Sequence, residues 1–222
     1  MLLYAITSRR LLPGDEAARR DRLVQLAGLW AQGGVNFIQV REKDLPLGEL
    51  QPLAAQIVQA VRTAERAPHK TQVLVNGPAQ LALDAGADGV HLHANAGVAA
   101  LQAATQAYAR AGRELVISAA CHSPEEIQQA SGANLLLFSP VFEKMTGQGM
   151  SRGQGLAALR AAVRQAQPAP VLALGGVTEK NAAAYVQAGA AGIAAIRLFL
   201  GEEWRALLQS SPSAAIRSPA TA

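Results

Sequence analysis

The segment CHSPEE at residues 121–126 holds the residue best suited to acid–base chemistry. His122 ends a short apolar run and precedes a Ser-Pro-Glu-Glu stretch that can start a helix, with Ser123 as its cap. Because imidazole titrates near neutral pH, His122 is a candidate general acid and base; a hydrogen-bonded structural histidine is the alternative. Cys121 should point to the opposite face of the strand, which disfavours a Cys–His nucleophile pair.

The segment QVREK at residues 39–43 carries two cations on one face of an extended chain. Arg41 can hold a carboxylate or a phosphate with paired hydrogen bonds, and Lys43 adds a point charge. The alternative is a structural salt bridge at the strand end, with Glu42 serving another partner. We expect this segment to bind an anionic part of a ligand.

A second anion site is predicted at GGVTEKN, residues 175–181, where a helix is expected to start. Gly175 and Gly176 let a ligand approach the backbone, and the first N–H groups of a helix attract phosphate. Gly153, in the stretch SRGQG, can add another backbone donor. The alternative is that the glycine pair only makes a tight turn.

Two further histidines, His91 and His93, share one face of their segment and could join His122 in a metal site. No carboxylate lies at a metal-ligand spacing beside them, and histidines more often belong to a core. We therefore predict no metal site here.

Residues this far apart in sequence share one site only if the fold gathers the ends of several strands. Short apolar runs recur, several of them apolar on both faces, as in a parallel sheet. Helical stretches rich in Ala, Leu and Gln separate them, which predicts an α/β fold. The apolar runs lie at 2–7, 37–42, 72–76, 89–93, 115–122, 135–140, 171–176 and 192–198. The helical stretches lie at 15–32, 47–66, 78–85, 97–111, 124–131, 155–166, 179–188 and 201–210.

An internal repeat refines this prediction. AQGGVNFIQV (31–40), AGADGVHL (85–92), ASGANLLLF (130–138) and QAGAAGIAAI (187–196) each read as a helix end, a Gly, a turn and a strand. Repetition of this unit predicts a single (β/α)8 TIM barrel, with an open doubly wound sheet as the alternative. We assign residues 1–208 to the barrel domain. The small, polar, Pro-containing residues 209–222 are expected to form a flexible C-terminal tail.

Composition limits the setting of the protein. The chain has 222 residues, 50% of them hydrophobic and 16% charged, which excludes global disorder. Its net charge of +4 is scattered, so a nucleic-acid partner is not expected. No apolar run is long enough to span a membrane, the first ten residues do not read as a signal peptide, and a single cysteine allows no intrachain disulfide. We expect a cytoplasmic protein.

From about residue 2 to residue 200, the chain resembles the thiamine phosphate synthase/TenI superfamily. The series of motifs in this order is far more specific than any one of them. The resemblance implies a phosphate-binding TIM barrel that acts on the thiazole phosphate half of thiamin. The matching motifs are YAIT (4–7), FIQVREK (37–43), VNG (75–77), AGADGVHL (85–92), CHSPEE (121–126), SPVFEKMTGQG (139–149) and LALGGVTEKNAAAYVQAGAAGIA (172–194).

Two activities are known on this scaffold. The synthase joins hydroxymethylpyrimidine pyrophosphate to thiazole phosphate with Mg²⁺, using an Asp after the third strand, a second Asp after the fourth, and a Thr-x-Thr-Lys loop after the sixth. Here Gly77 and, approximately, Ala96 stand at the Asp positions. In the loop Thr146 is kept, but Lys144 replaces the first Thr and Gly147 the Lys. Without both carboxylates, Mg²⁺ lacks the hard oxygen ligands it needs.

The other activity is that of the TenI thiazole tautomerase, which moves a proton and needs neither metal nor cofactor. The resemblance therefore favours the TenI branch. It implies His122 as the acid/base and a small phosphorylated thiazole as the substrate, and it leaves a homodimer open. The implied substrate-binding residues are Arg41, Lys43, Asn76 and Thr146, and the implied phosphate-binding residues are Gly153, Gly175, Gly176, Ile196 and Arg197.

Two alternatives remain at this stage. One is a divergent thiamine phosphate synthase that takes its Mg²⁺ ligands from elsewhere, with Asp44, Asp84 and Asp88 as candidates. The other is a non-catalytic regulatory protein that binds thiamin phosphate.

Overall fold

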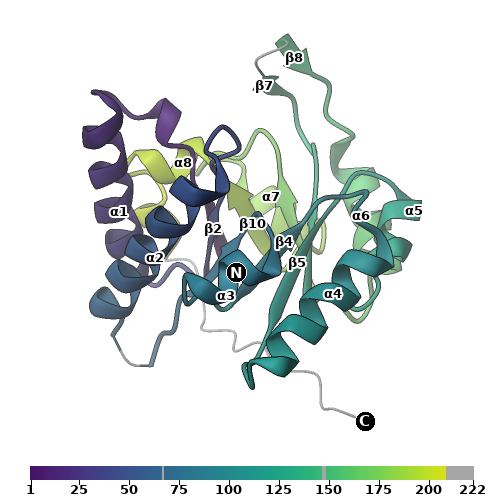
Figure 1. Cartoon of the computed structure of the whole chain (residues 1–222). Coiled ribbons are helices and arrows are strands. Elements are labelled where there is room, and N and C mark those ends of the chain that lie inside the picture. The colour runs from purple at the N-terminus through teal and green to yellow at the C-terminus, as the bar shows by residue number, and fades with distance from the viewer. Residues whose placement is uncertain (67, 147–148, 209–222) are drawn as a thin grey trace.

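A computed structural model describes residues 1–66, 68–146 and 149–208. Its strands form a closed parallel barrel in the order β1-β10-β9-β6-β5-β4-β3-β2 (Figure 1). The predicted (β/α)8 barrel is confirmed, and the open-sheet alternative is wrong. The predicted tail, 209–222, lies outside the described residues. The barrel strands are β1 (Leu2–Ile6), β2 (Phe37–Val40), β3 (Gln72–Val75), β4 (Gly89–Leu92), β5 (Val116–Cys121), β6 (Leu135–Phe138), β9 (Val171–Leu174) and β10 (Gly192–Ala195).

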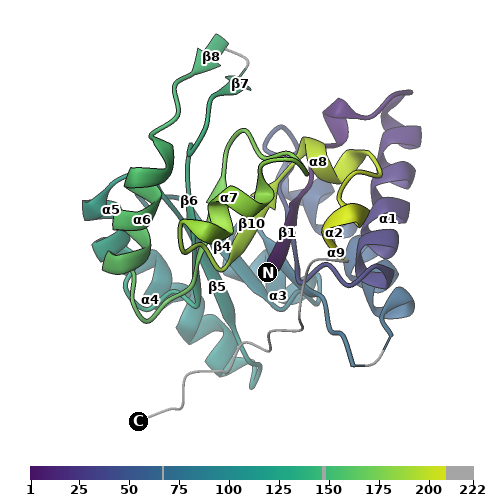
Figure 2. The same ribbon diagram turned by 180° about the vertical axis from the view of Figure 1, so that it is seen from behind.

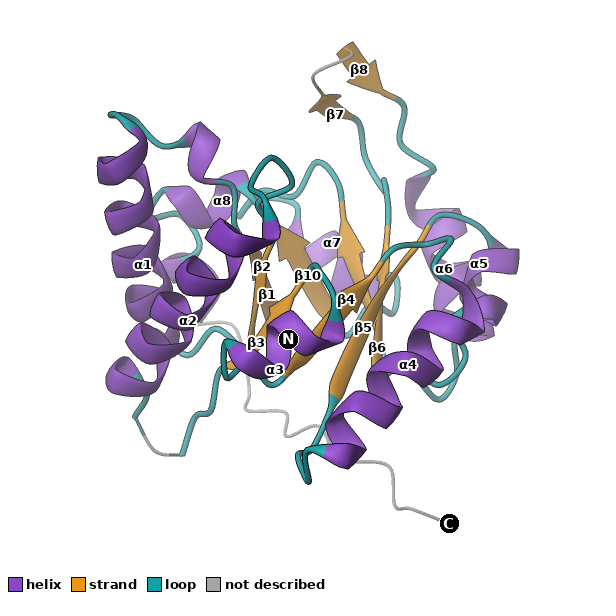
Figure 3. Ribbon diagram, in the orientation of Figure 1, coloured by secondary structure: helices purple, strands orange, loops and turns teal. Residues whose placement is uncertain are grey.

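Helices surround the barrel and cover the outer face of its strands (Figure 3). The 3-10 helix η1 (Arg9–Leu11) follows β1. None of the described helices is both long and apolar enough to cross a lipid bilayer. The α-helices are α1 (Glu16–Gln32), α2 (Leu47–Ala64), α3 (Ala79–Asp84), α4 (Gly97–Arg110), α5 (Pro124–Gln129), α6 (Gly155–Gln165), α7 (Ala182–Gln187), α8 (Arg197–Leu200) and α9 (Arg205–Leu208).

The last unit differs from its prediction. The strand expected at 192–198 ends at Ala195, and Arg197 begins α8. Of the helix expected at 201–210, the described residues form only α9, which starts at Arg205; Gly201 adopts an extended backbone that separates it from α8. In contrast, α5 starts as predicted: the Ser123 side chain accepts the N–H of Glu126, and Pro124 takes the first position.

Alternate residues of the strands build two separate cores. One face of each strand packs under the helices, as Ile38, Val73 and Ile117 do. The other face fills the barrel interior. Side chains alternate along a strand, so every second residue continues the interior face. Where the strand ends, the next residue of that face therefore points into the mouth of the barrel. The interior cluster contains Leu2, Tyr4, Ile6, Phe37, Leu74, Leu135, Leu137, Leu172 and Ala194.

The repeated Gly-turn-strand unit has a backbone cause. Each repeat places a glycine with positive φ two or three residues after the end of a helix, and L side chains rarely adopt that conformation. The four are Gly34 (84°), Gly86 (75°), Gly132 (100°) and Gly189 (98°).

An antiparallel hairpin projects from the carboxyl end of the barrel strands and was not predicted from sequence (Figures 1 and 2). It consists of β7 (Lys144–Thr146) and β8 (Gly149–Ser151), and residues 147–148 between them lie outside the described part. Figure 2 also shows the seam of the barrel, where β1 lies beside β10.

Candidate active site

Four basic side chains gather after β2 and β4. The backbone N–H of Arg41 donates to the Thr7 hydroxyl at 2.9 Å, which joins the ends of β1 and β2. Burial lowers the pKa of Arg41, and the positive charge of Arg41 is the main cause of a lowered pKa at Lys43. His93 also has a lowered pKa, first from burial and then from Lys43 and Arg41. Arg41 and Lys43 supply the positive charge of this group, and we call the four residues the basic cluster: Arg41, Lys43, His91 and His93.

Glu42 faces away from the basic cluster. Its carboxylate accepts the backbone N–H of Arg9 at 3.1 Å and the Arg9 guanidinium at 3.1 Å. Arg9 is only 4% exposed, and it also binds Asp44 through two hydrogen bonds of 2.8 Å and Glu16 through one of 2.7 Å. Within the described ranges, no carboxylate forms a salt bridge with Arg41 or Lys43. Their charges are therefore available to an anionic ligand.

Asn76 connects three strand ends. Its backbone N–H donates to Val40 on β2, and its side-chain amide donates to the carbonyl oxygen of His91 on β4 at 3.2 Å. The structure thus brings Arg41 and Asn76 to the same part of the mouth, as expected from sequence.

A polar chain beneath the basic cluster was missed from sequence. Nδ1 of His91 lies 2.8 Å from the Ser118 hydroxyl, which lies 2.9 Å from the Tyr4 hydroxyl. The side-chain amide of Gln39 donates to that same tyrosine oxygen at 3.0 Å. The available signal was a polar residue at interior positions of otherwise apolar strands, namely Gln39 in FIQV and Ser118 in VISAAC.

His122 lies on the surface of the mouth after β5, with its ring oriented by the end of β6. Nδ1 lies 2.7 Å from the carbonyl oxygen of Ser139 and 3.2 Å from its hydroxyl. Because a carbonyl oxygen only accepts, Nδ1 carries the hydrogen, and Nε2 of the neutral ring carries the lone pair. Gln154, also missed from sequence, donates to the same carbonyl at 3.1 Å. The backbone N–H of His122 donates to Glu126.

Cys121 takes no part in this arrangement. It is fully buried in the cluster beneath the helices, on the opposite face from His122, as predicted. Burial, with a smaller contribution from Glu126, raises the pKa of its thiol to about 12. It is therefore a protonated core residue.

The glycines predicted to bind phosphate pack against the segment after β6. A Cβ atom at Gly153 would lie 2.5 Å from the carbonyl oxygen of Val141, and one at Gly176 would lie 2.7 Å from that of Glu143. At Gly175 a Cβ would lie 2.9 Å from Cα of Pro140. Close packing of the loops after β6 and β9 thus requires these glycines. Their role toward phosphate remains a prediction.

The other predicted residues are spread around the mouth. Ile196 packs on the interior cluster, whereas Arg197 is exposed and has no salt bridge within the described residues. Thr146 belongs to β7, and the placement of its side chain lies outside the described part.

The side chains do not fit the Mg²⁺ site of the synthase pattern. In residues 1–66, 68–146 and 149–208, no group of three or more His, Cys, Asp or Glu side chains is placed to hold a metal ion. Asp44 is bound by Arg9, and Asp84 accepts from Gln80 on α3. Asp88 precedes β4 at the opposite end of the barrel, where it pairs with Arg62. At Gly77 and Ala96 no side-chain oxygen exists.

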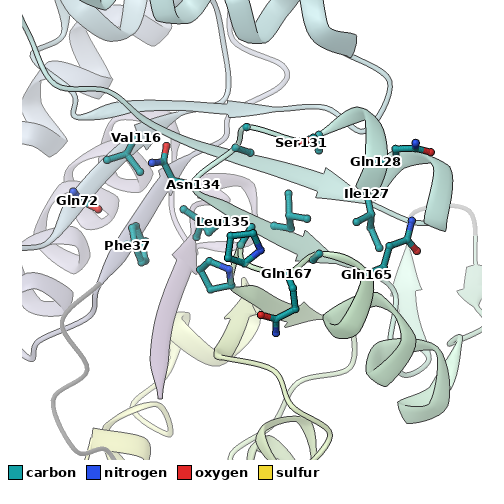
Figure 4. Close-up of a pocket in the computed structure, with 18 residues that line it drawn as sticks. Phe37, Gln72, Val116, Ile127, Gln128, Ser131, Asn134, Leu135, Gln165 and Gln167 are labelled. Carbon is teal, nitrogen blue, oxygen red and sulfur yellow. The ribbon is translucent and has the colours of Figure 1, made fainter. Parts of the chain in front are cut away.

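A cavity of about 940 Å³ lies at the amino ends of the strands, away from these residues (Figure 4). Its lining from the strands is Phe37, Gln72, Val116, Leu135 and Leu136, and the rest of the lining is 127–128, 130–134 and 165–170. Its lining contains no charged side chain and none of the predicted site residues. In TIM barrels this end serves stability, whereas the carboxyl ends of the strands carry the chemistry.

Comparison with known proteins narrows the identity of the chain. Residues 3–199 match the family model described as thiamine monophosphate synthase. A protein of Geobacter sulfurreducens named putative thiamine-phosphate synthase is 35% identical over 217 residues, which cover 95% of this chain and 94% of that protein. The thiamine-phosphate synthase of Methanoculleus marisnigri is 34% identical over 203 residues, or 90% of this chain and 88% of that one.

A solved structure agrees with these relatives. The thiamine phosphate pyrophosphorylase of Pyrococcus furiosus superposes with a TM-score of 0.71 at 29% identity, covering 94% of this chain and 92% of the other. The names of these relatives favour the synthase over the TenI branch that the sequence analysis predicted. The chain belongs to the thiamine monophosphate synthase family of thiamin-biosynthetic enzymes.

Proposed function

We propose that this protein is a thiazole tautomerase, which converts a carboxythiazole phosphate tautomer to the aromatic carboxythiazole phosphate. The observation that carries the proposal is the pairing of two cations, Arg41 and Lys43, that form no salt bridge among the described residues with His122, whose Nε2 makes no hydrogen bond in the same part of the chain. Such a mouth can bind an anion and move a proton. Among the residues that the structure describes, it offers no ligand set for the Mg²⁺ that the synthase reaction uses.

Binding begins with the two anionic groups of the substrate. Arg41, with Lys43 beside it, holds the ring carboxylate, and Asn76 donates a further hydrogen bond near it. The phosphate is held between the loops after β9 and β10, by Gly176, Ile196 and Arg197. Held at both ends, the ring presents its C2–H to His122.

His122 then transfers the proton in two steps. Nε2 takes the C2 proton, and the electron pair that is left behind spreads into the adjacent imine and carboxylate. The resulting imidazolium is stabilised because Nδ1–H already donates to the carbonyl oxygen of Ser139. Nε2–H then returns the proton to the exocyclic carbon, which makes the ring aromatic and restores neutral His122.

A thiamine-phosphate synthase is the second candidate, because the relatives of Geobacter and Methanoculleus carry that name at 35% and 34% identity. The candidate needs Mg²⁺ beside the pyrophosphate, and the described carboxylates do not fit that ion. The basic cluster alone could hold the pyrophosphate.

The deciding experiment gives the purified full-length protein two sets of substrates. In one, the carboxythiazole phosphate tautomer is followed by ultraviolet absorbance and by incorporation of deuterium from ²H₂O. In the other, hydroxymethylpyrimidine pyrophosphate and thiazole phosphate are supplied with and without Mg²⁺. We expect rapid tautomerisation without metal and no coupling. Mg²⁺-dependent coupling without tautomerisation would make the protein a synthase, and binding of thiamin phosphate without either reaction would make it a regulatory binder.

A further inference from the structure

The interior of the barrel contains a buried hydrogen-bond chain that ends at the basic cluster. It runs from Gln39 on β2 through Tyr4 on β1 and Ser118 on β5 to His91 on β4. Their exposed fractions are 1%, 0%, 0% and 7% in that order. A polar chain buried this deeply is costly unless its donors and acceptors match, so its proton arrangement is constrained.

The direction of the hydrogen bonds follows from the chain itself. The Gln39 amide donates to the Tyr4 hydroxyl, so the hydrogen of Tyr4 goes to Ser118. Ser118 then donates its own hydrogen to Nδ1 of His91. The opposite amide orientation would leave an NH₂ group unpaired in the core instead of one carbonyl oxygen. Lone acceptors are the more common of the two in proteins.

The two ends of the chain differ in their surroundings. At the inner end, Oε1 of Gln39 is fully enclosed and has no partner. At the outer end, Nε2 of His91 also has no partner in the described parts of the chain, but it is not among the fully enclosed atoms. The charged groups that act on His91 are His93, Arg41 and Lys43, all of them basic. Nε2 is therefore the unpaired outer end of the chain, and it lies beside the cations of the basic cluster.

We propose that the chain Gln39–Tyr4–Ser118 fixes His91 as its Nε2–H tautomer, which donates a hydrogen bond to an anionic oxygen of the ligand held by Arg41 and Lys43. On the proposed function, which this step extends, the oxygen belongs to the ring carboxylate of the substrate. In a synthase it would belong to the pyrophosphate. His91 is thus a hydrogen-bond donor and a positioning residue, distinct from the proton-transferring His122.

Neutrality of the ring fits this role. Burial, followed by the charges of His93, Arg41 and Lys43, lowers the pKa of His91 to about 3. A neutral imidazole donates through Nε2–H without adding another positive charge to a cluster that already repels itself. Because Nδ1 is engaged by Ser118, the ring cannot switch to the tautomer that would turn its lone pair toward the anion.

The test reads the tautomer directly. The ¹⁵N chemical shifts of ¹⁵N-histidine-labelled protein, assigned with His91→Gln, report which nitrogen carries the hydrogen. We expect the neutral Nε2–H form in the wild type between about pH 5 and pH 8, the range set by a histidine with a lowered pKa. Tyr4→Phe and Ser118→Ala break the chain and should produce a mixture of tautomers. Tyr108→Phe is the matched control, since it removes an equally buried hydroxyl that donates to Ala87 outside the barrel interior.

Adding ligands tests this inference separately from the proposed function. Inorganic pyrophosphate and carboxythiazole phosphate are each added, and either one should shift the Nε2–H resonance if it binds at the basic cluster. For the tautomerase, His91→Leu should raise KM by about 10- to 100-fold with little change in kcat, and His91→Gln, which keeps a donor, should restore most of the loss. A shift with pyrophosphate alone supports the donor role and argues against the tautomerase. An Nδ1–H or charged His91 in the wild type, or a resonance that neither ligand moves, overturns the inference.

Discussion

Nδ1 of His122 donates to the carbonyl oxygen of Ser139 at 2.7 Å, whereas Nδ1 of His91 lies 2.8 Å from the Ser118 hydroxyl, from which we infer that it accepts. The two histidines are therefore held in opposite tautomers at neighbouring strand ends. His122 presents a lone pair at Nε2, and His91 presents a hydrogen there. One ring of each kind suits a site that abstracts a proton and also holds an anion.

Replacing His122 by Asn should remove catalysis and keep the fold. Loss of a general acid and base typically lowers the rate by roughly 10² to 10⁴. His69→Asn, at an exposed turn, is the control. Both turnover and melting temperature are to be measured on each variant. A folded His122→Asn protein with normal turnover would remove the main reason for proposing a tautomerase, and a lowered melting temperature with normal turnover per folded molecule would make His122 structural.

Glu42→Gln should weaken substrate binding by loosening the loop that carries Arg41 and Lys43. The side chain of Glu42 is 2% exposed, and breaking such a buried pair costs on the order of 3 kcal/mol of unfolding free energy. Glu49→Gln is the control because its partner Arg20 is near the surface, where an ion pair contributes little to stability. Urea unfolding measures stability, and KM and kcat are measured in parallel. An unchanged KM for Glu42→Gln would show that the pair of Glu42 and Arg9 contributes to the fold but not to substrate binding.

The stability of the wild type should fall on acidification below pH 6.5. The pKa of His91 is about 3 in the folded protein, against 6.5 for an ordinary histidine, so between these values the unfolded chain binds the extra proton. Unfolding free energy then decreases as pH falls, with a slope that approaches about 1.4 kcal/mol per pH unit. His91→Gln should flatten the urea-unfolding profile between about pH 4.5 and pH 6.5, above the range of most carboxylates. A profile as steep as that of the wild type would contradict a buried neutral His91.

Gly176→Ala should lower both stability and phosphate affinity. Its φ of 65° and a contact of 2.7 Å from the added Cβ to the Glu143 carbonyl leave no room for a side chain. Gly48→Ala, in α2 with open space around it, should be neutral or stabilising by up to about 1 kcal/mol. Thermal unfolding with and without inorganic phosphate measures both effects. If phosphate stabilises Gly176→Ala as much as the wild type, phosphate binds elsewhere.

Gly77→Asp combined with Ala96→Asp tests whether missing carboxylates separate this chain from the synthases. A Cβ at Gly77 would meet Val75 at 3.5 Å and Leu50 at 3.7 Å, which are ordinary contacts, so the fold should accept the change. We expect calorimetric titration to show that Mg²⁺ binds to the double Asp variant and not to the wild type or to the double Asn control. Mg²⁺ binding to the wild type at the same strength would point to ligands beyond these two positions.

The barrel and the residues around its mouth were predictable because strand alternation and the Gly-turn units are local patterns. They directed Arg41, Asn76 and His122 to one end of the fold before any contact was known. The positive φ of Gly86 and its counterparts is the physical origin of the repeat.

The contacts that orient those residues were not predictable. The Arg9 clamp on Glu42 and the bond between Tyr4 and Ser118 join segments with no shared local pattern. The hairpin of β7 and β8 lies in the segment that the sequence analysis matched to the Thr-x-Thr-Lys loop of the synthases, where no strand was predicted. Local sequence patterns also cannot decide between a tautomerase and a synthase, because that difference depends on which side chains surround a bound metal ion or anion.

The seam between β1 and β10 has a consequence for biosynthesis of the chain itself. Leu2 pairs with Gly192, and a side chain at Gly192 would collide with the Leu2 backbone at 2.0 Å. During synthesis β1 therefore lacks this partner until β10 has been made, and until then the nascent sheet has two open edges that invite pairing with other chains. A message truncated before codon 192 should thus yield insoluble product rather than a smaller folded enzyme.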